Sequence, residues 1–500
     1  MGKGATPAQA KASAVMELAE RYSFFSFYKD PKNIFIDTHE NISNDVISFD
    51  LIAQSVNDES DDFEVSKKIF QSLPLKWTGA YNLTTGREIT IPLNWFYAIN
   101  AFNGPSAGNC VEEALCQGIC EIVERHVSSL ISMGKISTPS INLKSVTDML
   151  ILDMLNKYYV SGINLTVTDF TFKVGIPSVG VLAYDSKTFP KSSEIVWTAG
   201  TAPDPQKALS RALTEVAQLA GDFNTGSNYV SSGLPKFSSI AESGFVADTH
   251  RNISMFDLPN ISDMNIRIEV ENCVNALKNL NMETIVVDTT HPILKVPVFY
   301  TIVPGTHFRE RAANTSVAMF SAKIAAESFI ATEAISRLKD MDRLLPGKYF
   351  IQFYIGKCYL ELNQHDVALS YFSRALELDP NEQNIPSIYS YLGVCLKEMN
   401  RYEEAIQVLK KGEQIDDERT DIHNLKGFCY FMLKNYEKAI ESFTKVIYLD
   451  PSSAIDYANI ASNYRDMGKK DEAVRYYRLA LEIDPSIEFA VKNLDILTSK

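Results

Sequence analysis

The last third of the chain contains an internal repeat, which constrains the fold more than any other feature. Alanines recur at Ala368, Ala405, Ala439 and Ala473, spaced 37, 34 and 34 residues apart. Twelve positions before these alanines lie Gly356, Gly393, Gly427 and Ala461, and twelve positions after them lie Pro380, Asp417, Pro451 and Pro485. A repeating unit of this length is a supersecondary element that must stack on its neighbours to bury its apolar face.

The spacing is typical of tetratricopeptide (TPR) repeats, each made of two antiparallel helices. Small residues occur where the two helices cross, and proline occurs where the second helix must stop. The second repeat departs from this pattern because Asp417 stands at its proline position. We therefore expect four repeats over residues 346–500, closed by a capping helix formed by the last residues, IEFAVKNLDILTSK.

Residues 1–345 contain no such repeat, and the segment LLPGK at 344–348 interrupts the helical pattern before it. Segments rich in β-branched residues are predicted as strands; they are 33–37, 88–93, 163–170, 177–184, 284–288 and 296–303. Segments with 3.6-residue periodicity are predicted as helices; they are 7–23, 109–132, 204–220, 268–280 and 316–340. The sequence thus predicts a mixed α/β (α+β) domain followed by an all-α TPR solenoid.

The charge and hydropathy of the chain exclude several classes of protein. The net charge of −14 is opposite to the electrostatic footprint of a nucleic-acid binder, and it disfavours an anionic membrane surface as a partner. No run of about 18 apolar residues occurs, and the amino-terminal segment lacks the apolar core of a signal peptide. We therefore expect a cytoplasmic protein that binds neither nucleic acid nor membrane.

Seven cysteines in 500 residues are too few for a disulfide framework. Cys116 and Cys120 lie one helical turn apart, with Cys110 just upstream. This spacing permits a metal site, but we favour buried apolar cysteines, because no second Cys/His pair has ligand spacing.

One face of the predicted helix 109–132 carries an unusual set of polar residues. Glu113, Gln117, Glu121 and Glu124 fall within roughly 80° of one another on a helical wheel, at about 100° per residue. Like charges one turn apart destabilise a helix, and no lysine interrupts this row. A solvated acidic helix would normally interleave basic residues.

Two further helices carry related residues. Ser13, Glu17 and Glu20 share one face of the segment 7–23, and Arg211 lies one turn before Glu215 in the segment 204–220, where Asp204 is the predicted N-cap. Oxygen ligands of this kind suit Mg²⁺, which bridges carboxylates to substrate phosphates. A Mg-nucleotide site and ordinary surface charge on an acidic protein both remain open from the spacing alone.

Other motifs add little to these two alternatives. The sequence contains neither a P-loop nor a GxGxxG fingerprint. His126 points with the apolar side of its helix, so we expect a structural histidine. His307 follows a strand and precedes Arg309 and Arg311, which permits either a phosphate contact or a solvent-exposed loop.

The three polar helices resemble the YcaO family. The resemblance is carried by three ordered motifs, SxxxExxER (Ser13, Glu17, Glu20, Arg21), ExxxQxxxExxER (Glu113, Gln117, Glu121, Glu124, Arg125) and RxxxE (Arg211, Glu215). The GKG at 2–4, NGPSAGN at 103–109 and IVPG at 302–305 also look like this family. The resemblance covers roughly residues 1–330 and implies a YcaO-type ATP-binding catalytic domain over residues 1–345.

The resemblance implies ATP-dependent activation of a peptide amide. A nucleophile adds to the amide carbon, the amide oxygen is phosphorylated, and phosphate then leaves. A neighbouring Cys, Ser or Thr side chain gives an azoline, as in a cyclodehydratase, whereas a sulfide equivalent gives a thioamide. Because an amide oxygen is a very poor leaving group, the enzyme must mainly position the reactants and neutralise charge.

The resemblance also implies roles for individual residues. Glu17, Glu20, Glu121 and Glu124 would hold Mg²⁺. Ser13, Glu17, Glu113, Gln117 and Arg211 would contact the ATP, and Arg211 and Glu215 would be catalytic. Two departures from the family concern the ends: the first motif begins unusually early, as expected of a truncated amino end, and repeats replace a proline-rich carboxyl tail.

The repeats in place of the tail favour thioamide over azoline formation, the early first motif bears on whether the domain is fully active, and two functions stay open. One is an ATP- and Mg²⁺-dependent enzyme that modifies a peptide or protein backbone, with a sulfur-delivery or partner enzyme and a TPR module that recruits a protein or makes a homodimer. The other is a non-catalytic accessory protein for a methylthiotransferase that acts on a ribosomal protein, because an enterobacterial family member with a TPR-like carboxyl end is linked to that modification.

Overall fold

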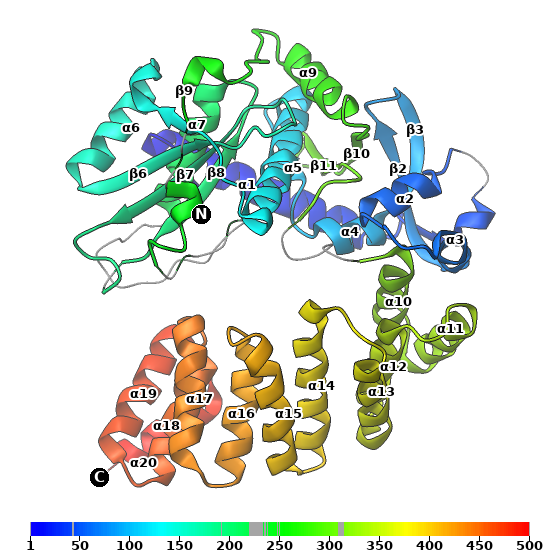
Figure 1. The fold of residues 1–500 in the computed structure, drawn as a ribbon, viewed down its shortest axis with the longest axis vertical. Coiled ribbons are helices and arrows are strands. Elements are labelled where there is room, and N and C mark those ends of the chain that lie inside the picture. The colour runs from blue at the N-terminus through cyan, green and yellow to red at the C-terminus, as the bar shows by residue number, and fades with distance from the viewer. Residues whose placement is uncertain are drawn as a thin grey trace. The chain divides into compact units, whose positions relative to one another are not determined.

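The computed structural model describes residues 2–42, 45–191, 193–219, 234, 237, 239–247, 249, 251–308 and 315–499. The chain divides into two compact units, Met1–Val317 and Ala318–Lys500 (Figure 1). The domain boundary predicted from the sequence lies at residue 345, whereas the two compact units divide after Val317. The difference arises because α11 (Ala331–Leu344) packs against the first repeat helix, α12 (Tyr349–Glu361).

The first unit contains an antiparallel sheet with the strand order β1-β2-β10-β11-β4. Its strands are β1 (Phe35–Asp37), β2 (Leu75–Asn82), β10 (Ile285–Asp288), β11 (Val298–Ile302) and β4 (Pro105–Ala107), and β3 (Arg87–Pro92) pairs with β2 outside this path. The register places Ile285 of β10 opposite Asn82 of β2. Segments more than 200 residues apart in sequence therefore form one sheet.

A second sheet in the same unit has the order β8-β7-β6-β5-β9. Its strands are β8 (Val196–Thr201), β7 (Ser178–Asp185), β6 (Ile163–Asp169), β5 (Ser140–Asn142) and β9 (Asn252–Ser254). Only the β5–β9 pair is parallel among the described strands of this sheet. All six predicted strands are confirmed, while five others, β2, β4, β5, β8 and β9, were not predicted, three of them only three residues long.

Four long helices of the first unit occupy predicted positions. They are α1 (Pro7–Lys29), α5 (Val111–Gly134), α7 (Pro205–Leu219) and α9 (Ile266–Lys278). Helix α5 contacts β4 and β11 of the first sheet, β8 of the second sheet, and α9, while α1 packs on β4 and β11 and α7 covers β7 and β8 (Figure 1). The helix with the most unusual residues therefore touches both sheets.

Two glycines allow this close packing of helices on sheets. A Cβ atom on Gly118 of α5 would lie 2.3 Å from Thr301 Oγ1 of β11. A Cβ atom on Gly200 of β8 would lie 2.3 Å from the Ala208 carbonyl oxygen of α7. Side chains at these two positions would push α5 and α7 away from the strands beneath them, together with the polar residues that both helices carry.

Shorter helical segments complete the first unit. They are α2 (Phe49–Ser55), α3 (Phe63–Gln71), α4 (Leu93–Asn100), α6 (Met149–Val160) and α8 (Gly244–Ala247), with 3₁₀ turns at His39–Asn41, Leu143–Ser145 and Met255–Asp257. Helix α7 begins as predicted, because Asp204 Oδ1 accepts hydrogen bonds from the backbone N–H groups of Gln206 and Lys207. Every described helix is too short or too polar to cross a membrane.

The second unit is helical throughout its described residues. The predicted helix 316–340 is instead two helices, α10 (Val317–Ser328) and α11, because the backbone is extended at Ile330. Four antiparallel pairs follow, and their helices are α12 with α13 (His365–Glu377), α14 (Ile385–Glu398) with α15 (Tyr402–Ile415), α16 (Thr420–Met432) with α17 (Tyr436–Leu449), and α18 (Ala454–Asp466) with α19 (Lys470–Ile483). A 3₁₀ turn at Glu382–Asn384 precedes α14, and α20 (Glu488–Thr498) packs on α19 as the predicted cap.

The repeat residues have the predicted structural role. The four periodic alanines are fully buried. A Cβ atom on Gly356 would lie 2.9 Å from the Phe372 ring, and one on Gly427 would lie 2.7 Å from the Phe443 ring. The period in the sequence therefore marks the points where the two helices of each repeat cross. These observations confirm the predicted order of an α/β domain followed by a TPR solenoid.

Candidate functional site

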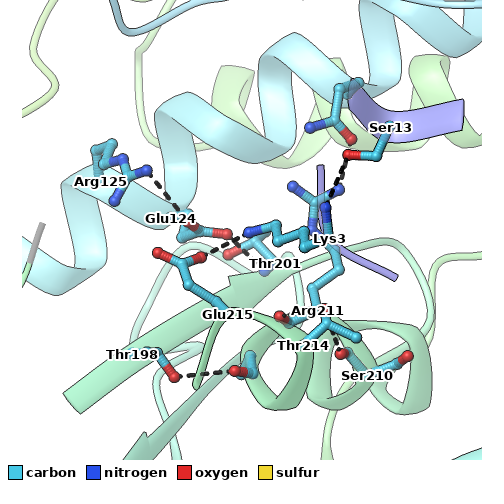
Figure 2. A network of polar contacts seen from close by, with 12 residues as sticks. Lys3, Ser13, Glu124, Arg125, Thr198, Thr201, Ser210, Arg211, Thr214 and Glu215 are labelled. Carbon is cyan, nitrogen blue, oxygen red and sulfur yellow. Dashed lines mark hydrogen bonds and ion pairs between the residues drawn. The ribbon is translucent and has the colours of Figure 1, made fainter. Parts of the chain in front are cut away.

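The predicted polar residues of α5 and α7 meet at the end of strand β8 (Figure 2). Glu124 of α5 is 4% exposed, and its Oε2 accepts a hydrogen bond of 3.2 Å from the backbone N–H of Thr201. Glu215 of α7 is also buried. Because the charges of Glu124 and Glu215 interact with each other, the first unit holds two buried carboxylates side by side.

The amino-terminal residues link this carboxylate pair to α1. Lys3 Nζ lies 2.8 Å from Glu215 Oε2, and the Lys3 backbone N–H donates a 3.3 Å hydrogen bond to Ser13 Oγ (Figure 2). Ser13, Glu215 and the GKG segment, which come from three parts of the sequence, therefore belong to one polar network.

Two arginines beside the carboxylates have unused donors. Arg211 Nη1 donates a 2.5 Å hydrogen bond to Gln117 Oε1, and Arg125 Nη2 lies 3.8 Å from Glu124 Oε1. Among the described residues, the buried Nε atoms of both arginines have no hydrogen-bond partner. An unpaired buried donor costs free energy, and an anionic ligand with several oxygens would satisfy it.

A second carboxylate pair joins α1 to α5. Burial raises the pKa of Glu20 to about 8, with further contributions from the nearby charges of Glu121 and Glu17, while Arg21 opposes the shift. Burial also raises the pKa of Glu121, against the opposing charges of Arg125 and Arg21. Two desolvated carboxylates close together disfavour ionisation of both, so a cation that joined them would relieve an unfavourable interaction.

The Glu124 carboxyl has a raised pKa for the same reasons. Burial is the larger cause, Arg125 opposes it, and the charge of Glu215 raises the pKa further. For Arg125, burial disfavours the charged form, yet Glu124, Glu215 and Glu121 together raise its pKa. The site thus brings acidic and basic side chains close together, and the acidic side chains outnumber the basic ones.

The structure does not bring every predicted residue into this set. The Glu113 carboxylate accepts two hydrogen bonds of 2.8 Å from the backbone N–H and the side-chain amide of Asn109. This contact satisfies an N–H group ahead of the first turn of α5, so here Glu113 stabilises the beginning of the helix. Glu17 is partly buried one turn before Glu20 and acts on the Glu20 pKa through its charge.

The carboxylates are arranged as pairs rather than as one cluster. In the described part of the chain, no three carboxylate oxygens of different residues lie within 4.8 Å of one another. The pairs Glu20–Glu121 and Glu124–Glu215 nevertheless suit Mg²⁺, which keeps several waters and takes only one or two protein carboxylates beside substrate phosphates. The residues present therefore fit Mg²⁺ together with a phosphate-bearing ligand.

The two histidines considered from the sequence, His126 and His307, lie against each other. His126 is buried, and its Nδ1 accepts a 3.0 Å hydrogen bond from the His307 backbone N–H, while the two rings stack 5.5 Å apart. Burial first, and His307 second, lower the pKa of His126 to about 4, which confirms the predicted structural role. Arg309 and Arg311 lie outside the described residues, so the predicted phosphate contact beside His307 stays a prediction.

The sequence predicts no individual role for Lys3 or Thr201, although both complete the site. Lys3 belongs to the GKG segment, and its contact with Glu215 spans 212 positions in sequence. Thr201 contributes a backbone N–H group, which leaves no signal in the side-chain pattern.

Comparisons with known proteins identify the family of the first unit. The family model described as YcaO cyclodehydratase, ATP- and Mg²⁺-binding, matches residues 1–307. A Methanothermobacter thermautotrophicus protein described as uncharacterized is 27% identical over 325 residues, which cover 61% of this chain and 80% of that protein. The ribosomal protein S12 methylthiotransferase accessory factor YcaO of Escherichia coli is 26% identical over 241 residues, covering 44% of this chain and 40% of that protein.

Structural and repeat comparisons support the same division of the chain. A heterocyclase solved in complex with substrate and cofactor has a TM-score of 0.51 and 22% identity, over 65% of this chain and 47% of that one. This likeness shows the fold alone, and the chain spans about half the length of that heterocyclase. Models of anaphase-promoting complex subunit 3 and of a tetratricopeptide repeat match residues 361–446 and 457–487.

The YcaO model covers more than half of the 500 residues. Figure 2 shows residues from all three motifs in one network: Ser13, Glu124, Arg125, Arg211 and Glu215. The chain therefore belongs to the YcaO family of ATP- and Mg²⁺-binding cyclodehydratases, and TPR repeats follow its YcaO domain.

Proposed function

We propose that this protein uses Mg-ATP to activate a backbone amide of a peptide or protein, giving a thioamide or an azoline. The observation that carries the proposal is the set of paired carboxylates, Glu124–Glu215 buried and Glu20–Glu121 partly buried, beside two arginines with unused donors. Such a set matches a divalent cation and a polyphosphate together. When bound, Mg-ATP supplies the phosphoryl group that turns the amide oxygen into a leaving group.

The residues of the chain have separate tasks in this proposal. The pairs Glu20–Glu121 and Glu124–Glu215 would hold Mg²⁺, with Glu17 beside the first pair. Arg211 would bind phosphate through its guanidinium, and Gln117 would hold that guanidinium in place, as it does in the structure. Ser13 would contact the nucleotide near Lys3, whose ammonium balances Glu215.

We favour the thioamide as the product, because it needs a sulfide equivalent delivered by a partner, and the carboxyl third of the chain is a repeat array of the kind that binds partner proteins. We propose that the array recruits the protein substrate, a sulfur-delivery enzyme, or a second copy of the chain, because stacked TPR helices build concave surfaces that bind peptides and helices.

Nucleotide binding is the first test. We expect calorimetry of the full chain with a non-hydrolysable ATP analogue to show binding that requires Mg²⁺. The Glu121→Gln substitution should weaken this binding at least about tenfold, which corresponds to roughly 1.4 kcal/mol. Glu112→Gln, in the first turn of the same helix, should leave the affinity unchanged. Equal affinities in wild type and Glu121→Gln would contradict the site.

Catalysis is tested by mass spectrometry. The full chain would be incubated with ATP, Mg²⁺ and candidate precursor peptides, with and without sulfide. Loss of water from the peptide identifies an azoline, whereas exchange of oxygen for sulfur identifies a thioamide. A chain ending at residue 317, where the compact units divide, should keep nucleotide binding but lose modification of its true substrate or its dimeric state.

A second candidate function is that of an accessory protein to a methylthiotransferase acting on a ribosomal protein. The similarity to the Escherichia coli methylthiotransferase accessory factor favours it. This function predicts that the chain alone modifies no peptide but raises the rate of a methylthiotransferase added to it. A mass change produced by the purified chain alone would exclude a purely accessory role.

A further inference from the structure

Three cysteine thiols meet where α9 packs on α5. The sulfur atoms of Cys116 and Cys120 on α5 and of Cys273 on α9 all lie within 4.8 Å of one another, and all three residues are buried. This is the only such group of potential ligand atoms in the part of the chain that the structure describes. Cys110, which precedes α5, is not part of it.

The packing of the two helices explains how the group forms. Cys116 and Cys120 are four residues apart, so their side chains share one face of α5. Cys273 lies on the buried face of α9 with Val270, Val274 and Leu277. The sequence permits a metal site at Cys116 and Cys120 but favours buried apolar cysteines, because no second Cys/His pair has ligand spacing. The third thiol instead comes from a helix more than 150 positions away, and only tertiary packing reveals it.

The arrangement fits a metal–thiolate centre. A Zn–S bond of about 2.3 Å places sulfur ligands of a tetrahedral site about 3.8 Å apart. The three sulfurs of this group are already within 4.8 Å, so a contraction of at most about 1 Å would give that geometry. Thiolates select zinc and monovalent copper over the hard cations that oxygen ligands prefer.

We propose that Cys116, Cys120 and Cys273 form a binding site for a thiophilic metal ion, Zn²⁺ or Cu⁺, that fixes α9 against α5. The site is distinct in chemistry from the oxygen ligands for Mg²⁺. Cys116 and Cys120 directly precede Gln117 and Glu121 in the sequence, so the ion would hold in place the helix that carries the nucleotide-site residues.

The test measures metal in the full chain, prepared without a histidine tag under reducing conditions. After chelation, the protein would be reconstituted separately with Zn²⁺ and with Cu⁺, and bound metal counted by elemental analysis and native mass spectrometry. We expect one thiophilic ion per chain, and the arm that retains its ion against a competing chelator identifies the metal. Reconstitution with Co²⁺ should produce thiolate-to-metal charge-transfer absorption.

Matched variants locate the site. Cys273→Ser and Cys120→Ser should lose the ion and the cobalt charge-transfer band. Cys110→Ser, next to α5 but outside the group, and Cys358→Ser, a buried cysteine of the second unit, should keep both. Retention of the ion by Cys273→Ser would overturn the proposal.

The wild-type measurement decides the question if the variants fail to fold. No bound Zn²⁺ or Cu⁺ after reconstitution, with no cobalt charge-transfer band, would show that the three cysteines are only buried apolar side chains. A mass two hydrogens lower under non-reducing conditions, with no metal bound, would show a disulfide instead and would equally overturn the proposal.

Discussion

The two units of this chain bury polar groups in opposite ways. In the first unit, carboxylates lie beside carboxylates, and burial raises the pKa values of Glu20, Glu121 and Glu124. In the second unit, buried charges have partners of complementary kind, such as Lys426 with Glu413 at 2.5 Å and Asn424 with Asp456 at 2.6 Å.

The difference separates a binding site from a scaffold. Removing like charges from water is costly unless a counter-charge accompanies them, so the first unit stores an unfavourable interaction that a bound cation relieves. In the repeats the buried Lys426 and Asp456 have partners, and the helix crossings consist of glycine or alanine against aromatic rings or leucine. We therefore expect mutations to separate the two units cleanly, affecting ligand binding in one and stability in the other.

The largest expected effect is on the stability of the repeats. Phe443 is buried against Gly427, so Phe443→Ala should lower the free energy of unfolding of the second unit by about 3–5 kcal/mol. Calorimetric melting of the full chain measures this change. The half-exposed Phe428 provides a control, and Phe428→Ala should cost much less. A parallel loss of Mg-ATP binding in Phe443→Ala would break the separation between the units.

The next largest effect is on activity. Arg211→Ala should lower kcat/KM by the equivalent of roughly 1.5–3 kcal/mol, because a charge-assisted contact to phosphate is lost. The melting temperature should change little. Arg267→Ala, which removes an exposed arginine of α9, is the matched control. Normal turnover in Arg211→Ala would contradict the assigned role, and a collapsed melting transition would indicate a structural role instead.

The Glu20–Glu121 pair predicts a dependence on pH. Folded Glu20 keeps its proton up to about pH 8, because burial and the neighbouring Glu121 raise its pKa, whereas the unfolded group loses its proton near 4.5. Stability without Mg²⁺ should therefore fall as the pH rises between these values. Mg²⁺ affinity should rise over the same range, by up to about tenfold per pH unit below 8, since binding displaces a proton.

Calorimetry in two buffers with different ionisation enthalpies measures the released proton directly. Because Glu121 and Glu124 also have raised pKa values, Glu20→Gln should reduce the proton release and the stability slope without abolishing them, while Glu112→Gln should leave both intact. Proton release that is unchanged in Glu20→Gln would assign the titration to the other groups.

The smallest expected effect concerns Lys3. Its side chain is 31% exposed, so solvent weakens its ion pair with Glu215. Lys3→Met should lower the stability of the first unit by about 1 kcal/mol or less, and added salt should reduce the difference. Thermal unfolding at low and high salt measures this, with Lys11→Met on α1 as the control. A loss as large as that of Phe443→Ala would mean that Lys3 is the principal counter-charge of the site.

Local periodicity made much of this protein predictable. The alanine and glycine spacing specified the repeats, because these small residues make their close contacts between the two helices of one repeat. The row Gln117, Glu121 and Glu124 was assigned to one helix face from the 3.6-residue geometry alone. Six strands were found because β-branched residues are frequent in them, whereas β2 has only one, Thr78. Strand β8, with Val196, Thr198 and Thr201, carries the same signal and was not predicted.

The remaining features depended on contacts between distant segments. The contact of Lys3 with Glu215 and the meeting of Cys273 with Cys116 join residues that no local pattern relates. The Glu20 pKa likewise depends on burial and on Glu121, which only packing supplies. The sequence by itself therefore determined the helices, the repeats and the residue types of the site. Tertiary structure alone decided which charges are desolvated and paired, because desolvation and electrostatic interaction depend on distance in space rather than in sequence.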